Sequence, residues 1–153
     1  MMRGLTLNFM NETILDMDEN AVIDAVCQYL KIEGYIIESV LTTTQKGIDI
    51  TARHEQKGVL LIEAKGGTSS RRGSARYGLS YTETQVLDRV ARGFFTIAEL
   101  KNKYPNASVA LAVPKTPYFL KYLARIEKSL LLLNCQVLLV NPTKTVTPMK
   151  MER

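Results

Sequence analysis

The sequence predicts a single α/β domain with a mixed sheet and helices on both of its faces. Its 153 residues suffice for one domain with a continuous core and are too few for two ordinary domains. Hydrophobic residues make up 46% of the chain and charged residues 23%, which is ordinary globular usage. Helical and strand periodicities follow in the order α-β-β-β-α-β-α-β. This order predicts an antiparallel meander followed by crossover units.

The first half of the chain predicts one helix and three strands. Residues 1–17 alternate only weakly, and the pattern leaves open an N-terminal dimer arm or a frayed end. Asp18 is placed to cap a helix whose apolar residues recur at helical spacing until Gly34. The polar turn 55–58 joins two of the strands as a hairpin. The expected strands cover residues 35–44, 47–54 and 59–65.

The second half predicts the crossover units. Thr82 and Gln85 match a capping box, which starts a helix reaching about residue 104. Thr116 as cap and Pro117 at the first helical position start another helix that continues to about residue 129. Two buried strands and a frayed tail complete the pattern, at residues 108–114, 135–140 and 143–153 respectively.

Several classes of protein are excluded by what the sequence lacks. No apolar run approaches the roughly 18 residues that cross a bilayer, and the first residues do not resemble a secretory signal. A cytoplasmic protein without a membrane partner is therefore expected. Cys27 and Cys135 lie in apolar patterns and are expected to be buried thiols. The single histidine, His54, has no partner at zinc-site spacing, so a zinc site is not expected.

The charge balance favours a polyanionic partner. Twenty Lys and Arg against fifteen Asp and Glu give a formal net charge of +5. Residues 66–81 are rich in Gly and Ser, which predicts a loop between a strand and a helix. We expect its basic side chains to contact phosphates and a tyrosine to stack on a base, although a merely solvated loop is the alternative. The residues concerned are Arg71, Arg72 and Arg76, with Tyr77 or Tyr81.

Three residues of the predicted hairpin carry the chemistry. Glu63 and Lys65 are two apart, so on a strand they project from the same face. Burying both charges is costly unless they are paired or have a function. Asp49 can reach the same place from the preceding strand, and two carboxylates with a nearby carbonyl suit Mg²⁺. The alternatives are an exposed charge pair at Glu63 and Lys65 and a turn at Asp49.

At these residues the chain resembles the PD-(D/E)XK nuclease superfamily. The motif is Gly47-Ile48-Asp49, thirteen intervening residues, then Glu63-Ala64-Lys65. Ile48 stands where many members have proline, as in the GxD branch. The resemblance covers about residues 18–140 and implies the restriction-endonuclease-like αβββαβ core. It also implies that Asp49 and Glu63 bind the metal and that Lys65 serves the nucleophile.

Two further positions follow from the same resemblance, which is strongest to the Holliday-junction-resolvase and RecB-like branches. An acidic metal contact on the first helix falls on Asp24, with Glu19 as its rival. Gln85 falls where RecB-like branches have a supporting glutamine, whereas Arg89 departs from their tyrosine. Both positions also have a purely structural explanation. The helix dipole stabilises an acidic residue near a helix start, and Gln85 completes the capping box.

The function expected from these observations is a Mg²⁺-dependent endonuclease acting on DNA, with Mn²⁺ as a plausible substitute. A chain of this size favours structure-selective or broad cleavage, and cutting both strands requires a homodimer. The alternatives are an inactive nucleic-acid-binding module and an assembly subunit, the latter favoured by an exposed apolar face on the 116–130 helix. The nuclease reading requires Asp49, Glu63 and Lys65 to converge on one face of the sheet.

Overall fold

The computed structural model describes residues 17–41, 46–69 and 79–152. The segment 1–17, for which the sequence leaves open both a dimer arm and a frayed end, therefore lies outside the described residues, apart from Met17, which is buried in the core. The arginine-rich part of the predicted loop, with Arg71, Arg72, Arg76 and Tyr77, also lies outside them. None of the helices in the described segments is long and apolar enough to cross a membrane.

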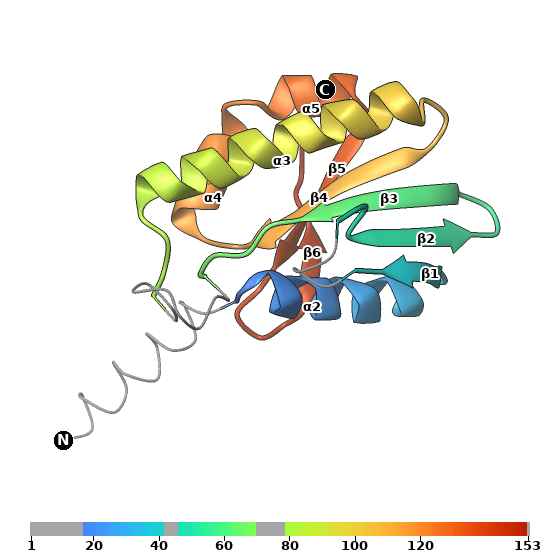
Figure 1. Ribbon diagram of the computed structural model, residues 1–153, viewed down its shortest axis with the longest axis horizontal. Helices are drawn as coiled ribbons and strands as arrows, with labels where there is room; N and C mark the ends of the chain where they lie inside the picture. Colours follow the sequence, from blue (N-terminus) through green and yellow to red (C-terminus); the bar gives the residue numbers. More distant parts are fainter. Residues whose placement is uncertain (1–16, 42–45, 70–78, 153) are drawn as a thin grey trace.

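The expected α/β architecture is confirmed: one mixed sheet lies between helices on both faces (Figure 1). Helix α2 covers one face, and α3, α4 and α5 lie on the other. The strands are in the order β1-β2-β3-β4-β5-β6. In chain order the elements are α2 (Glu19–Ile32), β1 (Ile36–Val40), β2 (Ile50–His54), β3 (Gly58–Ala64), α3 (Glu83–Lys103), β4 (Ser108–Pro114), α4 (Pro117–Ala124), α5 (Glu127–Leu132), β5 (Cys135–Val140) and β6 (Val146–Pro148).

The pairing of the strands follows from their connections. β1, β2 and β3 form the expected antiparallel meander, and the β2–β3 turn ends at Gly58, whose φ of 79° suits glycine. β3–β4 and β4–β5 are parallel pairs, because a helical crossover returns the chain to the same end of the sheet each time. β6 pairs antiparallel with β5.

Both long helices start at the caps that the sequence predicts. The Asp18 carboxylate accepts a hydrogen bond from the Ala21 N–H at 2.9 Å. At α3 the Thr82 N–H donates to Gln85 Oε1 at 2.8 Å, and the Gln85 N–H donates to Thr82 Oγ1 at 3.3 Å. These bonds satisfy main-chain donors that a helix start leaves without partners.

Alternation along the strands divides the buried residues into two cores. Even-numbered residues of β3 pack beneath α2, whereas Leu61 packs with α3 and α4. Val59 is half-buried against the same α3-side core. The neighbouring odd-numbered positions of β3 and its extension are Glu63 and Lys65, so both side chains belong to the face that α3 partly covers.

The single helix expected over 116–129 is two helices. Thr116 caps α4 and Pro117 starts it, as predicted, but α4 ends at Ala124. The N–H groups of Arg125 and Ile126 then bond to carbonyls three residues back rather than four, which tightens the chain before α5 begins. Neither glycine nor proline marks this break.

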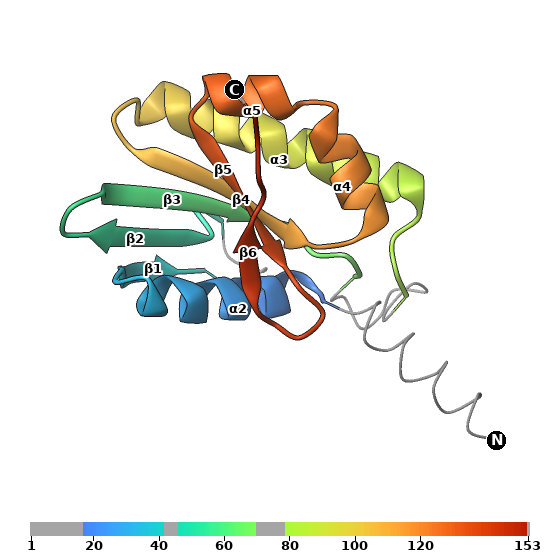
Figure 2. The same cartoon turned by 180° about the vertical axis from the view of Figure 1, so that it is seen from behind.

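The frayed tail expected over 143–153 is wrong for the described part of that segment. The chain turns back after β5, with Lys144 at a φ of 70°, and adds β6 to the edge of the sheet (Figure 2). The Asn141 side-chain amide donates to Thr145 and Thr147 across this turn. Val146 then packs on the α2-side core, which makes ordering of the segment favourable.

Candidate active site

The candidate site lies where β2 and β3 separate. The last residue pair between them is Ile50↔Ile62. Asp49 therefore lies just before β2, whereas the sequence predicts a strand over 47–54 that contains it. Its Oδ2 atom accepts the Ala64 N–H at 2.8 Å, and its carbonyl accepts the Leu41 N–H at 2.9 Å. The carboxylate thus takes the place of a main-chain partner, which fixes its position beside the end of β3.

Glu63 and Lys65 form a nearly buried ion pair at the end of β3. Lys65 Nζ lies 2.8 Å from Glu63 Oε2, and the two side chains are 14% and 10% exposed. Helix α3 approaches closely here because it has a glycine at position 93. A Cβ atom at Gly93 would lie 2.8 Å from Leu111 Cδ1 and 3.6 Å from Lys65 Cγ. Because both side chains are nearly buried, the alternative of an exposed charge pair is excluded.

The Asp49 carboxylate joins this pair through Glu63. Burial raises the pKa of Glu63 to about 7, and the negative charge of Asp49 and a hydrogen bond shared with it act in the same direction. The hydrogen bond and the charge of Lys65 oppose this rise. Asp49, Glu63 and Lys65 therefore converge on one face of the sheet, as the nuclease hypothesis requires.

The first helix brings Glu19, not Asp24, to this group. Burial raises the pKa of the Glu19 carboxyl, Asp49 raises it further, and Lys65 and Arg89 lower it, so all three charges lie near it. Asp24 is exposed and lies five residues later, about 140° around the helix at 3.6 residues per turn. The metal contact expected on the first helix stays a prediction, and the position of Glu19 favours it over Asp24.

A glycine behind Lys65 allows this approach of the helix. A Cβ atom at Gly66 would lie 2.4 Å from the Glu19 nitrogen and 2.7 Å from the Asp18 carbonyl carbon. Any other residue would push the start of α2 away from the strand, because main-chain atoms cannot yield as a flexible side chain can. The Gly67 N–H also donates to the Met17 carbonyl at 2.8 Å. A glycine directly after the Glu63-Ala64-Lys65 motif was the sequence signal for this contact.

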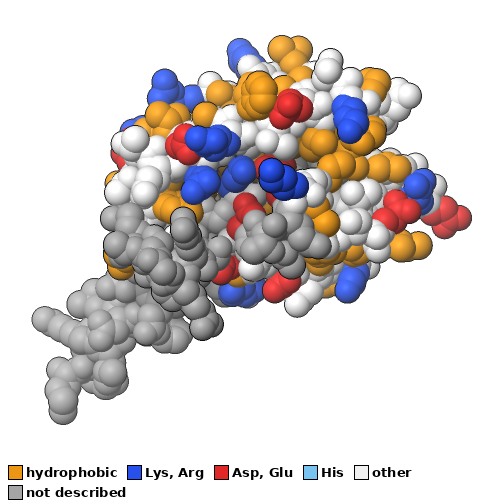
Figure 3. Space-filling model, viewed as in Figure 1, with side chains coloured by type: hydrophobic (Ala, Val, Ile, Leu, Met, Phe, Trp, Pro, Cys, Tyr) orange, Lys and Arg blue, Asp and Glu red, His pale blue; other side chains and the backbone are white. Residues whose placement is uncertain are grey.

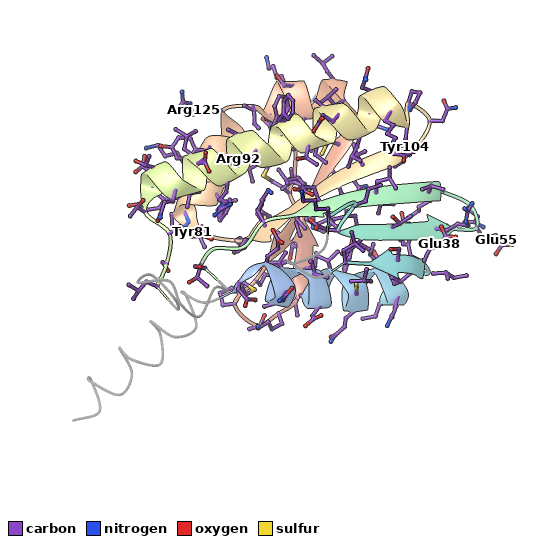
Figure 4. The ribbon with its side chains drawn as sticks, viewed as in Figure 1. Glu38, Glu55, Tyr81, Arg92, Tyr104 and Arg125 are labelled. Carbon is purple, nitrogen blue, oxygen red and sulfur yellow. The ribbon has the colours of Figure 1, made fainter. Side chains whose placement is uncertain are left out.

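Arg89, which the sequence indicated only as a departure from a family pattern, lies near Glu19. It projects from α3, and its positive charge acts on Glu19. Its guanidinium lies over the Tyr81 ring, 5.0 Å from the centroid, and donates to the Tyr81 hydroxyl at 3.3 Å. Figure 4 labels Tyr81 at the start of α3 and Arg92 further along it. Figure 3 shows a row of Lys and Arg side chains along this side of α3, beside acidic ones.

The position of Gln85 supports its structural role. Its Oε1 atom is used in the capping box, one helical turn before Arg89. The catalytic role expected for Gln85 stays a prediction. The phosphate contacts expected from Arg71, Arg72, Arg76 and Tyr77 lie outside the described residues. Tyr81, the other tyrosine expected to stack on a base, lies within the described residues, and its hydroxyl accepts a hydrogen bond from Arg89.

The donor set fits a hard divalent cation with few protein ligands. Within the described segments no three His, Cys, Asp or Glu side chains form a ready-made metal-binding group. Asp49 and Glu63 nevertheless place two carboxylates in contact, and burial followed by the charge of Asp49 raises the pKa of Glu63 although Lys65 opposes the rise. Mg²⁺ commonly uses one or two carboxylates and takes its other ligands from water and substrate phosphates.

Comparison with solved structures supports the fold. The structure is similar to that of an XisH family protein from Nostoc punctiforme PCC 73102, with a TM-score of 0.54, 18% sequence identity, and coverage of 86% of this chain and 99% of that one. It is also similar to an fdxN element excision controlling factor protein from Anabaena variabilis, with a TM-score of 0.53, 16% identity, and coverage of 84% and 96%. No family model and no curated protein matches the sequence. At these identities the similarity establishes a shared α/β architecture.

Proposed function

We propose that this protein is a Mg²⁺-dependent nuclease that hydrolyses phosphodiester bonds of DNA. The observation that carries the proposal is the convergence of Asp49, Glu63 and Lys65 at the point where β2 and β3 separate. A nearly buried Glu63–Lys65 pair beside a second carboxylate costs folding free energy, which favours a functional role for the group. In hydrolysis a water oxygen bonds to phosphorus as the bond from phosphorus to the ester oxygen breaks.

The roles of the three side chains follow from their contacts. Asp49 and Glu63 would hold the Mg²⁺, which would supply Lewis-acid polarisation of a phosphate oxygen and would lower the pKa of a water molecule. The Ala64 N–H orients the Asp49 carboxylate toward Glu63. Lys65 is held by Glu63 Oε2, so its ammonium can donate to the attacking water or to the phosphate.

Arg89 is suited to binding the phosphate that is cut. The Tyr81 ring and hydroxyl hold one side of its guanidinium, which lowers the entropy lost on binding. A guanidinium carries five N–H donors, and its planar fork matches two phosphate oxygens. Arg89 therefore adds positive charge at the site beyond that of the metal and Lys65.

DNA is the substrate that the remaining observations favour. The net charge of +5 supports binding of a polyanion. One structurally similar protein is described as an element excision controlling factor, and excision of a genetic element involves cutting of DNA. We expect structure-selective or broad endonuclease cleavage, with a homodimer where both strands are cut.

A second candidate function, that of an assembly subunit, has one observation in its favour. The surface of α3, α4 and α5 exposes large apolar side chains, including Phe95 at 65% and Leu132 at 88%. A groove of about 440 Å³ beside Phe95 is lined by Leu87, Phe94 and Ile126. Such patches often mark protein contacts. A protein partner there is compatible with the proposed nuclease site, which lies on a different side of α3.

A nicking assay tests the proposed function directly. Supercoiled plasmid and branched oligonucleotides are incubated with Mg²⁺, Mn²⁺ or EDTA, using wild type, Lys65→Ala and Lys128→Ala. Lys128 is exposed on α5, so Lys128→Ala is the matched control for the loss of a lysine outside the site. We expect metal-dependent cutting that Lys65→Ala abolishes and Lys128→Ala retains. Salt-sensitive binding without cutting in either metal would favour the inactive binding module.

A further inference from the structure

A cavity lies on the same face of the sheet as the candidate site. It has a volume of about 660 Å³ and lies between the end of α3 and the β1–β2–β3 meander. Figure 4 labels Tyr104 and Glu38 on its two sides, and Figure 3 shows hydrophobic side chains exposed between them. The residues that matter for its chemistry are Thr51, Arg53, Val59, Leu61, Lys103 and Tyr104.

The strand register connects this cavity to Asp49 and Glu63. Leu61 pairs with Thr51, and Val59 pairs with Arg53. These are the next same-face positions after Glu63. Glu63 and Val59 are four positions apart on the strand, or about 14 Å at 3.4 Å per residue. At about 3.4 Å per stacked nucleotide this is the length of roughly four nucleotides, and fewer where the strand is stretched.

The lining of the cavity combines an apolar floor with a polar, cationic rim. Val59 and Leu61 provide the floor, and Tyr104 presents an aromatic ring that is 39% exposed. Lys103 Nζ lies 5.4 Å from the centroid of that ring. Arg53 pairs with Glu38 through its Nε atom at 3.3 Å, which uses one of five guanidinium donors. Counting Glu38, the charged side chains of the lining leave one net positive charge.

We propose that this cavity binds an unpaired nucleotide of the substrate strand, a few nucleotides from the bond that is cut. The inference rests on the proposed function and names its substrate class as DNA with a single-stranded segment next to the cut. A base can stack on Tyr104 above the apolar floor while Lys103 and Arg53 bind its flanking phosphates. A single strand that follows the sheet face from the candidate site reaches this cavity.

Unpaired substrate is favoured because of what the cavity offers. Stacking on an aromatic side chain needs a free base face, and a base inside a duplex has both faces covered by its neighbours. The cavity is in the range of volumes that hold one small organic ligand. It therefore suits one base with its sugar rather than a paired duplex.

The test measures binding without cleavage. Fluorescence anisotropy in EDTA compares a labelled single-stranded oligonucleotide with a duplex of the same sequence. The variants are Tyr104→Ala, Tyr104→Phe and Tyr118→Ala, a matched control whose 43%-exposed ring lies on α4 outside the cavity. We expect Tyr104→Ala to weaken single-strand binding by about tenfold and duplex binding by less than about twofold. Tyr104→Phe and Tyr118→Ala should bind like wild type, and thermal unfolding confirms that all variants are folded.

Three results would overturn the inference: wild-type single-strand affinity for Tyr104→Ala, an equal loss on duplex, or a changed oligomeric state of Tyr104→Ala. The last result would make the cavity a contact between copies of the chain. Lys128→Ala, an exposed position on α5 outside the cavity, is measured in the same assay and should bind normally. If wild type cuts nothing while Tyr104→Ala still loses single-strand binding, the proposed function fails and the binding site stands. If wild type cuts and Tyr104→Ala binds normally, only the binding site fails.

Discussion

Replacing Glu63 by glutamine should stabilise the metal-free protein at alkaline pH. The folded pKa of Glu63 is about 7, against an ordinary value of 4.5, because the carboxyl is buried beside Asp49. A carboxyl whose pKa is raised by folding stabilises the folded state in its protonated form. For Glu63 this stabilisation is fully present below pH 4.5 and is lost as the pH rises through about 7. The free energy of unfolding should therefore fall across this window. The shift corresponds to at most about 3 kcal/mol at about 1.4 kcal/mol per pH unit.

Glutamine imitates the protonated carboxyl and can still accept a hydrogen bond from Lys65. Near pH 8 in EDTA, Glu63→Gln should therefore be more stable than wild type by up to about 3 kcal/mol, and near pH 5 the difference should be small. Urea unfolding followed by far-UV circular dichroism measures this, since the chain has no tryptophan. Glu99→Gln, on the exposed surface of α3, is the control.

Magnesium should reverse the order, because two ionised carboxylates bind it and a carboxylate with an amide binds it more weakly. Added Mg²⁺ should raise the unfolding free energy of wild type more than that of Glu63→Gln. The reasoning is refuted if Glu63→Gln is less stable than wild type near pH 8 in EDTA. It is also refuted if wild-type stability does not fall between pH 4.5 and 7.

Two further substitutions test how the site is assembled. Gly66→Ala should destabilise the protein by about 2 kcal/mol or more, because its Cβ would overlap the Asp18–Glu19 main chain. Gly67→Ala should cost less, because its nearest neighbour would be Pro114 Cγ at 3.3 Å and the Met17 carbonyl oxygen would lie at 3.7 Å. Urea unfolding measures both, and equal losses would contradict the contact. Arg89→Ala should lower the single-turnover cleavage rate at saturating DNA by about 10²-fold, with Arg89→Lys recovering only part, because a lysine lacks the planar fork. Unchanged rates would remove Arg89 from the site.

The sequence by itself determined what depends on neighbouring residues. The Asp18 cap, the Thr82–Gln85 capping box and the Pro117 helix start were all predictable, because each interaction spans three residues or fewer. The meander was predictable from alternation and from the polar turn before Gly58. The spacing of Asp49, Glu63 and Lys65 predicted their convergence, since pairing of two strands fixes which residues face each other.

Only the tertiary structure decided what depends on distant segments. β6 forms because its residues pair with the edge strand β5 and Val146 packs on the α2-side core. No local pattern in this polar segment predicts either contact. Glu19 rather than Asp24 reaches the site because Gly66 lets the start of α2 contact the end of β3. Gly93 allows α3 to pack closely over Lys65, and Arg89 lies about one turn earlier on the same helix. In each case the deciding contact joins residues far apart in the chain, and its geometry exists only after the helices have packed on the sheet.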